Sequence, residues 1–157
     1  MAQAMFGAGC FWGVESKFRM LDGVLSTSVG YSGGSVPDPN YELVCTGTTG
    51  HAEVVEIEYN ESVITYDELL QVFWNVHDPT QLNRQGPDIG TQYRTVILYT
   101  SLEQKDNALK SITKEQKKYK LDITTQVEPI GDYYLAEDYH QQYLEKQGLS
   151  SCHVNLK

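Results

Sequence analysis

The clearest alternation of apolar and polar residues in this chain runs from Ala52 to Tyr59. Neighbouring side chains of a strand point to opposite faces, so Glu53 shares a face with Val55 and Ile57. Charged side chains are seldom placed on an apolar face without a partner or a task. The pattern therefore predicts a strand and marks Glu53 as a candidate for chemistry.

A helix is predicted from Thr65 onward, because Thr65 and Glu68 have the spacing of a capping box. An apolar stripe at helical spacing follows, formed by Leu69, Leu70, Phe73 and Val76. Pro79 bars continuation, since proline lacks the N–H group that a helix needs.

Shorter patterns predict the remaining elements. Helices are expected at 11–21, 101–120 and 136–147, strands at 24–31, 94–100 and 123–130, and a helical turn at 41–45. The chain shows no repeat, low-complexity segment or linker. We therefore expect one α+β domain over 1–157, a mixed sheet with helices packed on it in a two-layer, plait-like arrangement, with long irregular segments. The longest of these is 78–92, and loops of this length are often functional.

The composition narrows the class of function. The chain has 157 residues, a formal net charge of −9 and 40% hydrophobic residues, which suits one globular domain. The negative balance argues against nucleic acid and anionic membranes as partners, since both are bound by clustered Lys and Arg. No apolar run approaches the roughly 20 residues of a membrane span, and no signal stretch opens the chain. We expect a soluble, cytoplasmic protein.

The three cysteines, Cys10, Cys45 and Cys152, are far apart in the sequence. An odd number in a reducing compartment argues against a disulfide framework. The chain has no C-x-x-C or H-E-x-x-H motif and its histidines lack zinc-ligand spacing, so we expect no metal and no bound cofactor. What remains is thiol chemistry, or buried cysteines that pack as small hydrophobic residues.

Cys10 is the strongest candidate for a nucleophile. It follows the small residues Gly7-Ala8-Gly9, which leave room for a substrate to approach beside Gly9, and it precedes a predicted helix. The N–H groups and the dipole at a helix start favour a thiolate, whereas a free thiol has a pKa of about 8.5. In the alternative, Cys10 is buried beside Phe11 and Trp12. These aromatic residues either belong to the core or form the wall of an apolar pocket.

Seven motifs, in order along the chain, resemble one known family. Gly9-Cys10-Phe11-Trp12-Gly13-Val14-Glu15 is similar to the signature of the methionine sulfoxide reductase A family. The other six are Gly30-Tyr31-Ser32-Gly33-Gly34, Pro39-Asn40-Tyr41 with Cys45, Gly50-His51-Ala52-Glu53, His77-Asp78-Pro79-Thr80, Asp88-Ile89-Gly90-Thr91-Gln92-Tyr93-Arg94 and Ala136-Glu137-Asp138-Tyr139-His140-Gln141-Gln142-Tyr143-Leu144. The resemblance covers essentially the whole chain. It implies an enzyme that reduces methionine S-sulfoxide, free or in proteins, and so repairs oxidised proteins.

The resemblance implies that Cys10 attacks the sulfoxide sulfur and becomes a sulfenic acid. It further implies that Glu53 protonates the sulfoxide oxygen as a general acid. The apolar face of the predicted strand supports this role, because desolvation raises the pKa of a carboxyl and keeps its proton available. An ion pair between Glu53 and a cation such as Arg94 is the alternative, and it would lower that pKa.

The resemblance also assigns residues to the substrate. Tyr41 and Tyr93 would donate hydrogen bonds to the sulfoxide oxygen, and Asp88 would help to hold the substrate and a water molecule. Phe11 and Trp12 match the residues that pack around the methyl group of the substrate. In the alternative, Asp88 only begins a turn.

A second thiol is implied for the sulfenic acid, which condenses readily to a disulfide. By resemblance, Cys152 would resolve Cys10, and thioredoxin or another dithiol would then reduce the disulfide. In the alternative, Cys152 is an idle thiol of the tail. Cys45 matches a family position that has no required catalytic role, so we expect it to be structural. The expected partners are thus oxidised methionine and thioredoxin, and the expected state is a monomer.

Two other functions stay open at this point. A cysteine hydrolase would use His51, His77 or His140 as its base, although no local pattern pairs a histidine with Cys10. A peptide-binding module that docks methionine or aromatic side chains would need no reactive thiol.

Overall fold

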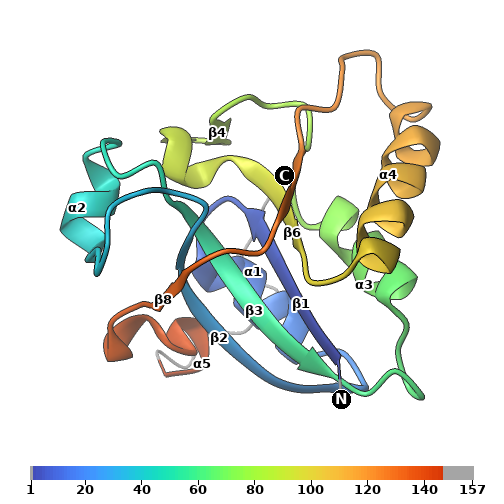
Figure 1. Ribbon diagram of the computed structural model, residues 1–157, viewed down its shortest axis with the longest axis horizontal. Helices are drawn as coiled ribbons and strands as arrows, with labels where there is room; N and C mark the ends of the chain where they lie inside the picture. Colours follow the sequence, from blue (N-terminus) through green and yellow to red (C-terminus); the bar gives the residue numbers. More distant parts are fainter. Residues whose placement is uncertain (1, 147–157) are drawn as a thin grey trace.

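The computed structural model describes residues 2–146, which form one α+β unit around a six-stranded sheet (Figure 1). In spatial order the strands are β7 (Gln126–Pro129), β6 (Thr95–Tyr99), β1 (Ala2–Ala8), β3 (Ala52–Tyr59), β2 (Val24–Ser32) and β8 (Tyr133–Leu135). Neighbouring strands are antiparallel, except that β6 and β7 are parallel. The predicted α+β class with a mixed sheet is confirmed.

Strand β1 lies at the centre of the sheet, yet no pattern in the sequence predicted it. Its burial explains why, since every residue from Ala4 to Ala8 is buried. Phe6 faces the main core, whereas Met5 faces a second cluster on the other side of the sheet. A strand that is covered on both faces shows no alternation of apolar and polar residues.

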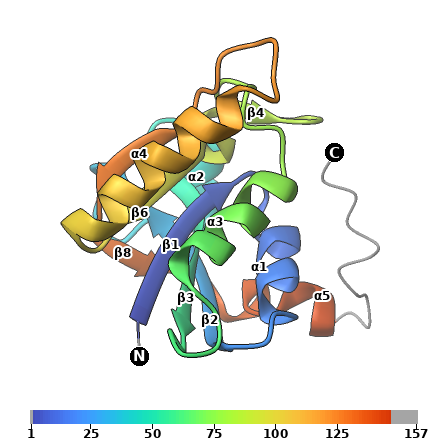
Figure 2. The ribbon, with the colours of Figure 1, turned by 90° about the vertical axis from the view of Figure 1, so that its right-hand side faces the viewer.

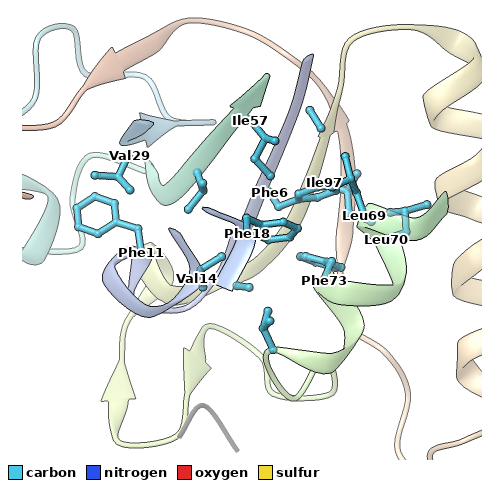
Figure 3. Packing of buried hydrophobic residues seen from close by; sticks show 14 of the residues in the cluster. Phe6, Phe11, Val14, Phe18, Val29, Ile57, Leu69, Leu70, Phe73 and Ile97 are labelled. Carbon is cyan, nitrogen blue, oxygen red and sulfur yellow. The ribbon is translucent and has the colours of Figure 1, made fainter. Parts of the chain in front are cut away.

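Helices α1 (Phe11–Arg19) and α3 (Tyr66–Asn75) cover one face of the sheet (Figure 2). Between them lies the main core, where the ring of Phe6 is centred 5.5 Å from that of Phe18 and 5.1 Å from that of Phe73 (Figure 3). Helix α4 (Leu102–Gln116) packs beside α3 and against β6 and β7. Aromatic packing from three elements therefore fixes the position of α1, which begins directly after Cys10.

The opposite face of the sheet is covered by an irregular segment of the chain rather than by helices. Its apolar cluster, formed by Met5, Ala52, Val54, Val96 and Leu98, packs against Ile130 and Tyr133. The segment between β7 and β8 crosses this face and carries β8 to the far edge of the sheet (Figure 1). The helices thus lie on one side, as the predicted two-layer arrangement requires.

Capping side chains begin both long helices, α3 and α4. The capping box of Thr65 and Glu68 is present, as predicted. Ser101 accepts from the N–H of Gln104 at 3.2 Å, which confirms the predicted start of α4, but this helix ends at Gln116 rather than near residue 120. The short helix α2 (Tyr41–Cys45) is also confirmed.

The long connection at 78–92 has a structure that the sequence pattern did not show. It contains a two-stranded hairpin, β4 (Arg84–Gln85) and β5 (Asp88–Ile89), and leads into a 3-10 turn over Thr91–Tyr93. The hairpin brings Asp88 and the turn brings Tyr93 toward the end of β1.

The single helix predicted over 136–147 is wrong within the described residues. The described part of this range instead contains a 3-10 turn at Asp138–His140 and the short helix α5 (Tyr143–Lys146), joined by irregular chain. We refer to residues 137–146 as the C-terminal segment.

Long-range hydrogen bonds explain why this segment does not continue as a helix. The side-chain amide of Gln141 accepts from the N–H of Val29 and donates to its C=O, both at 2.9 Å, so it extends the edge of β2. The backbone N–H of Gln142 donates to the buried carboxylate of Glu15 at 2.8 Å, and Gln142 has a φ of +49°. These partners lie more than a hundred residues away, so no local pattern reveals them.

Candidate active site

Cys10 lies at the junction between β1 and α1 and is the N-cap residue of the helix. Gly9 makes this junction possible, because its φ is +98° and a Cβ on it would lie 2.9 Å from the side chain of Gln85. Gln85 is buried, and its amide is held by the N–H and C=O of Asp78 at 3.0 and 2.8 Å. The hairpin of the long connection thus packs directly against the residue before Cys10.

The surroundings of Cys10 correct the expectation of a thiolate. Burial and the negative charge of Glu53 raise the pKa of the Cys10 thiol to about 12, although the N–H groups of Trp12 and Gly13 act in the opposite direction. The helix start alone predicted a lowered pKa, but it stabilises an anion less than removal from water destabilises it. Without substrate, Cys10 is a protonated thiol at neutral pH.

Glu53 lies on β3, on the same face as the core residues Val55 and Ile57, and is 1% exposed. Its Oε1 accepts from the N–H of Phe11 at 3.2 Å. Its Oε2 is buried and has no hydrogen-bond partner among residues 2–146. Burial raises the pKa of Glu53 to about 8, so the carboxyl holds its proton at neutral pH.

The alternative ion pair with Arg94 is not formed. The Arg94 guanidinium donates instead to the side chain of Gln126 at 3.1 Å and to the carbonyl of Thr91 at 3.0 Å. No salt bridge involving Glu53 occurs in the described part of the chain. The unpartnered Oε2 is therefore left to interact with a ligand.

Tyr41, the first residue of α2, and Tyr93, the last residue of the 3-10 turn, share a neighbour in Cys45. The thiol of Cys45 lies close enough to both phenols to raise the pKa of each. Burial raises the pKa of both phenols, and the charge of Glu53 adds to the effect, so both keep their protons and can donate. Cys45 is exposed, and its expected structural role stays a prediction.

Asp88, the first residue of β5, belongs to the same group. It is partly buried, and its negative charge adds to the raised pKa of both Cys10 and Glu53. The structure therefore brings together residues from four separate parts of the sequence around Cys10.

The two aromatic residues after Cys10 differ in their surroundings. Phe11 is buried in the main core, with its ring centred 5.8 Å from that of Tyr31. Trp12 is only partly buried, and its indole N–H donates to Nδ1 of His140 at 2.8 Å. The indole also stacks on Tyr143 with a centroid distance of 3.8 Å and an interplanar angle of 10°. Phe11 is thus a residue of the core, whereas Trp12 is held from the C-terminal segment.

Three residues near the site were given no role in sulfoxide reduction by the sequence, namely Gln85, Glu137 and His140, of which His140 was considered only as the base of a hydrolase. Glu137 accepts from the hydroxyl of Tyr31 at 2.9 Å and from the N–H of Tyr41 at 3.0 Å, so it fixes the start of α2. The motif from Ala136 to Leu144 was the only signal for two of them, and it carried no information about single residues. Gln85 had no signal, because its role is to fill the space beside Gly9.

The structure gives no support to a cysteine hydrolase. Both ring nitrogens of His51 and of His77 are hydrogen bonded to other groups, and His140 accepts from Trp12. No histidine forms a hydrogen bond with Cys10 among residues 2–146. Cys152, the expected resolving cysteine, lies outside the described residues.

Two further features concern residues 2–146 only. These residues contain no group of three His, Cys, Asp or Glu side chains that is placed to hold a metal ion. None of their helices is both long and apolar enough to cross a membrane.

Comparison with known proteins shows the same family throughout. The family model for peptide methionine sulfoxide reductase matches residues 2–157. A peptide methionine sulfoxide reductase MsrA of Methanothermobacter thermautotrophicus is 56% identical over 154 residues, which are 97% of this chain and 91% of that protein. One of Acidobacterium capsulatum is 54% identical over 156 residues, or 98% of this chain and 100% of that protein.

Solved structures share the fold. Reduced Mxr1 from Saccharomyces cerevisiae superposes with a TM-score of 0.89 at 39% identity, covering 94% of this chain and 86% of that one. Methionine sulfoxide reductase A of Corynebacterium diphtheriae has a TM-score of 0.85 at 40% identity, covering 94% and 76%. Mxr1 in complex with Trx2 has a TM-score of 0.65 at 27% identity, covering 90% and 84%. The match over nearly the whole chain, the high identity and the shared fold together show that this chain belongs to the peptide methionine sulfoxide reductase family and is an oxidoreductase.

Proposed function

We propose that the protein reduces methionine S-sulfoxide, free or within proteins, with Cys10 as nucleophile and Glu53 as general acid. One observation carries this proposal: the buried Oε2 of Glu53 has no partner within residues 2–146, and Glu53 lies close enough to Cys10 for its charge, once it is ionised, to raise the pKa of the thiol. A sulfoxide oxygen is a hydrogen-bond acceptor, so it supplies what a protonated Oε2 lacks. Family membership supports the same substrate.

The first step balances without a cofactor. The sulfur of Cys10 forms a bond to the sulfoxide sulfur while Glu53 protonates the oxygen, which makes the oxygen a better leaving group. The sulfur–oxygen bond of the substrate and the new sulfur–sulfur bond then break as the hydroxyl group passes to the sulfur of Cys10, giving methionine and a cysteine sulfenic acid. Methionine sulfur gains two electrons and Cys10 loses two. The thiol proton of Cys10 replaces the one that Glu53 gave.

The remaining residues orient the substrate. Tyr41 and Tyr93 keep their hydroxyl protons and donate to the sulfoxide oxygen, where negative charge develops. Asp88 holds the substrate from the hairpin side. Phe11 and Trp12 accommodate the methyl group, because both aromatic rings follow Cys10 directly at the start of α1.

The sulfenic acid is resolved by Cys152, which forms a disulfide with Cys10 and releases water. A dithiol protein then exchanges with this disulfide and restores both thiols. Thioredoxin is the proposed reductant, and the solved complex of Mxr1 with Trx2 supports this choice. A reducing compartment such as the cytoplasm would supply it.

Two variants test the proposal. Cys10→Ser removes the nucleophile, so it should abolish reduction of the S-sulfoxide even with dithiothreitol. Cys152→Ser should retain reduction with dithiothreitol but lose turnover with thioredoxin, and mass spectrometry should detect trapped sulfenic acid on Cys10. Reduction by Cys10→Ser at the wild-type rate would show that the proposal is wrong.

A further inference from the structure

The indole of Trp12 is held by two residues that come from the far end of the chain. Its N–H donates to Nδ1 of His140 at 2.8 Å, across 128 residues of sequence. Its face stacks on Tyr143 at 3.8 Å. Trp12 itself lies in the first turn of α1, two residues after Cys10. The orientation of this indole is therefore decided by the C-terminal segment rather than by α1.

The contact with Trp12 defines the protonation of His140. An indole N–H can only donate, so Nδ1 of His140 must present its lone pair, and the proton of the neutral ring resides on Nε2. Burial lowers the pKa of His140 below its ordinary value, against the opposing charge of Glu137. At neutral pH the ring is therefore uncharged and able to accept.

His140 differs from the other two described histidines in what its second nitrogen does. His51 and His77 have both ring nitrogens hydrogen bonded. Nε2 of His140 is buried and has no partner among residues 2–146. An unpaired buried donor costs about 1–3 kcal/mol, and folded proteins rarely keep one without a reason. The hydrogen bond to Trp12 is the one hydrogen bond that the buried ring of His140 forms among residues 2–146.

The ring of His140 also supports the other side of the proposed substrate pocket. Its centroid lies 5.2 Å from that of Phe11 and 4.6 Å from that of Tyr41. His140 is 0% exposed, so it lies behind these residues and does not reach the substrate directly. A residue in this place acts on the substrate only by holding its neighbours.

We propose that His140 is a positioning residue that fixes the Trp12 indole as a rigid wall and thereby limits the size of the alkyl group accepted beside the sulfoxide sulfur. The inference rests on the proposed function, in which Trp12 borders the methyl group. With the acceptor removed, the indole gains rotamer freedom that substrate binding must then restrict. A freed Trp12 indole can also move aside for an alkyl group larger than methyl. Binding and selectivity should therefore change more than the chemical step.

The test compares His140→Phe with His140→Gln. Phe keeps a ring of similar size but has no acceptor, whereas the amide oxygen of Gln can accept from the indole N–H. Steady-state rates are measured with dithiothreitol as reductant on the S-sulfoxides of methionine and ethionine, which differ by a methyl against an ethyl group. His140→Phe should raise KM for the methionine sulfoxide about fivefold, the equivalent of one hydrogen bond, with a smaller change in kcat. The preference of His140→Phe for the methyl over the ethyl substrate should fall. His140→Gln should have the KM and the preference of the wild-type protein.

Trp12→Phe supplies the matched control, because phenylalanine has no N–H for His140 to accept. In that background, His140→Phe should add no further change in KM or in the methyl-to-ethyl preference. Equal effects in both backgrounds, or a wild-type preference in His140→Phe, would overturn the inference and leave His140 as packing alone. Thermal melting checks that the variants fold, and His140→Leu serves as the acceptor-free variant if His140→Phe does not fold.

The outcome also separates this inference from the proposed function. If the wild-type protein reduces neither sulfoxide, the proposed function fails. If it reduces both and the His140 variants behave like the wild type, only the role of His140 fails.

Discussion

The backbone N–H of Phe11 donates to Oε1 of Glu53 at 3.2 Å, so the residue that follows the nucleophile holds the proposed acid. This bond occupies one carboxyl oxygen and leaves Oε2 buried without a partner in the described residues. This bond thereby ties the start of α1 to the start of β3.

Glu53→Gln should slow the first chemical step by about 100-fold or more, which is the range for loss of a general acid. Glutamine keeps the shape and can still accept from Phe11, but it has no acidic proton. Quenched-flow measurement of sulfenic acid formation in a single turnover reports this step alone. An unchanged rate would remove Glu53 from the role of acid.

The same substitution should lower the pKa of Cys10. Burial raises this pKa first and the charge of Glu53 raises it second, so removing the charge leaves only the effect of burial. The rate of alkylation of Cys10, followed against pH in a Cys45→Ser, Cys152→Ser background, measures it, because only the thiolate reacts. A pKa that is equal with Glu and Gln at position 53 would contradict the electrostatic contact between the two residues.

The first step should lose rate as the pH rises through about 8. Glu53 has a raised pKa of about 8, so it is protonated below that value and becomes a carboxylate, useless as an acid, above it. Single-turnover rates between neutral pH and mildly alkaline pH show the decline in the wild-type protein. The decline should be absent in Glu53→Gln, because this slower variant has no carboxyl at position 53 to titrate.

Gly9→Ala should destabilise the junction that presents Cys10. The new Cβ would lie 2.9 Å from Gln85, whose amide is held in place, and the φ of +98° is strained for alanine. We expect a loss of about 1–3 kcal/mol in the free energy of unfolding, and slower sulfenic acid formation.

Gly47→Ala is the control for this prediction. Gly47 also has a positive φ, +77°, but a Cβ there meets nothing within 4 Å. It therefore reports backbone strain alone, and chemical denaturation compares the two variants. Equal losses would show that the contact between Gly9 and Gln85 has no importance of its own.

The sequence by itself determined the features that depend on near neighbours. The alternation from Ala52 to Tyr59 placed Glu53 on the core face of β3, and Thr65 with Glu68 marked the start of α3. Strand periodicity and capping act over a few residues, so they can be read along the chain. The motifs around Cys10 indicated the family in the same way.

Only the tertiary structure decided how distant segments act on these residues. Strand β1 had no readable pattern because both of its faces are buried. The predicted C-terminal helix gave way to bonds from Gln141 and Gln142 to β2 and α1. The thiolate expected at Cys10 became a thiol with a raised pKa, because burial and Glu53 outweigh the helix start. Desolvation, the charge of a distant residue and the pairing of Trp12 with His140 arise only when the chain has folded, and no local pattern records them.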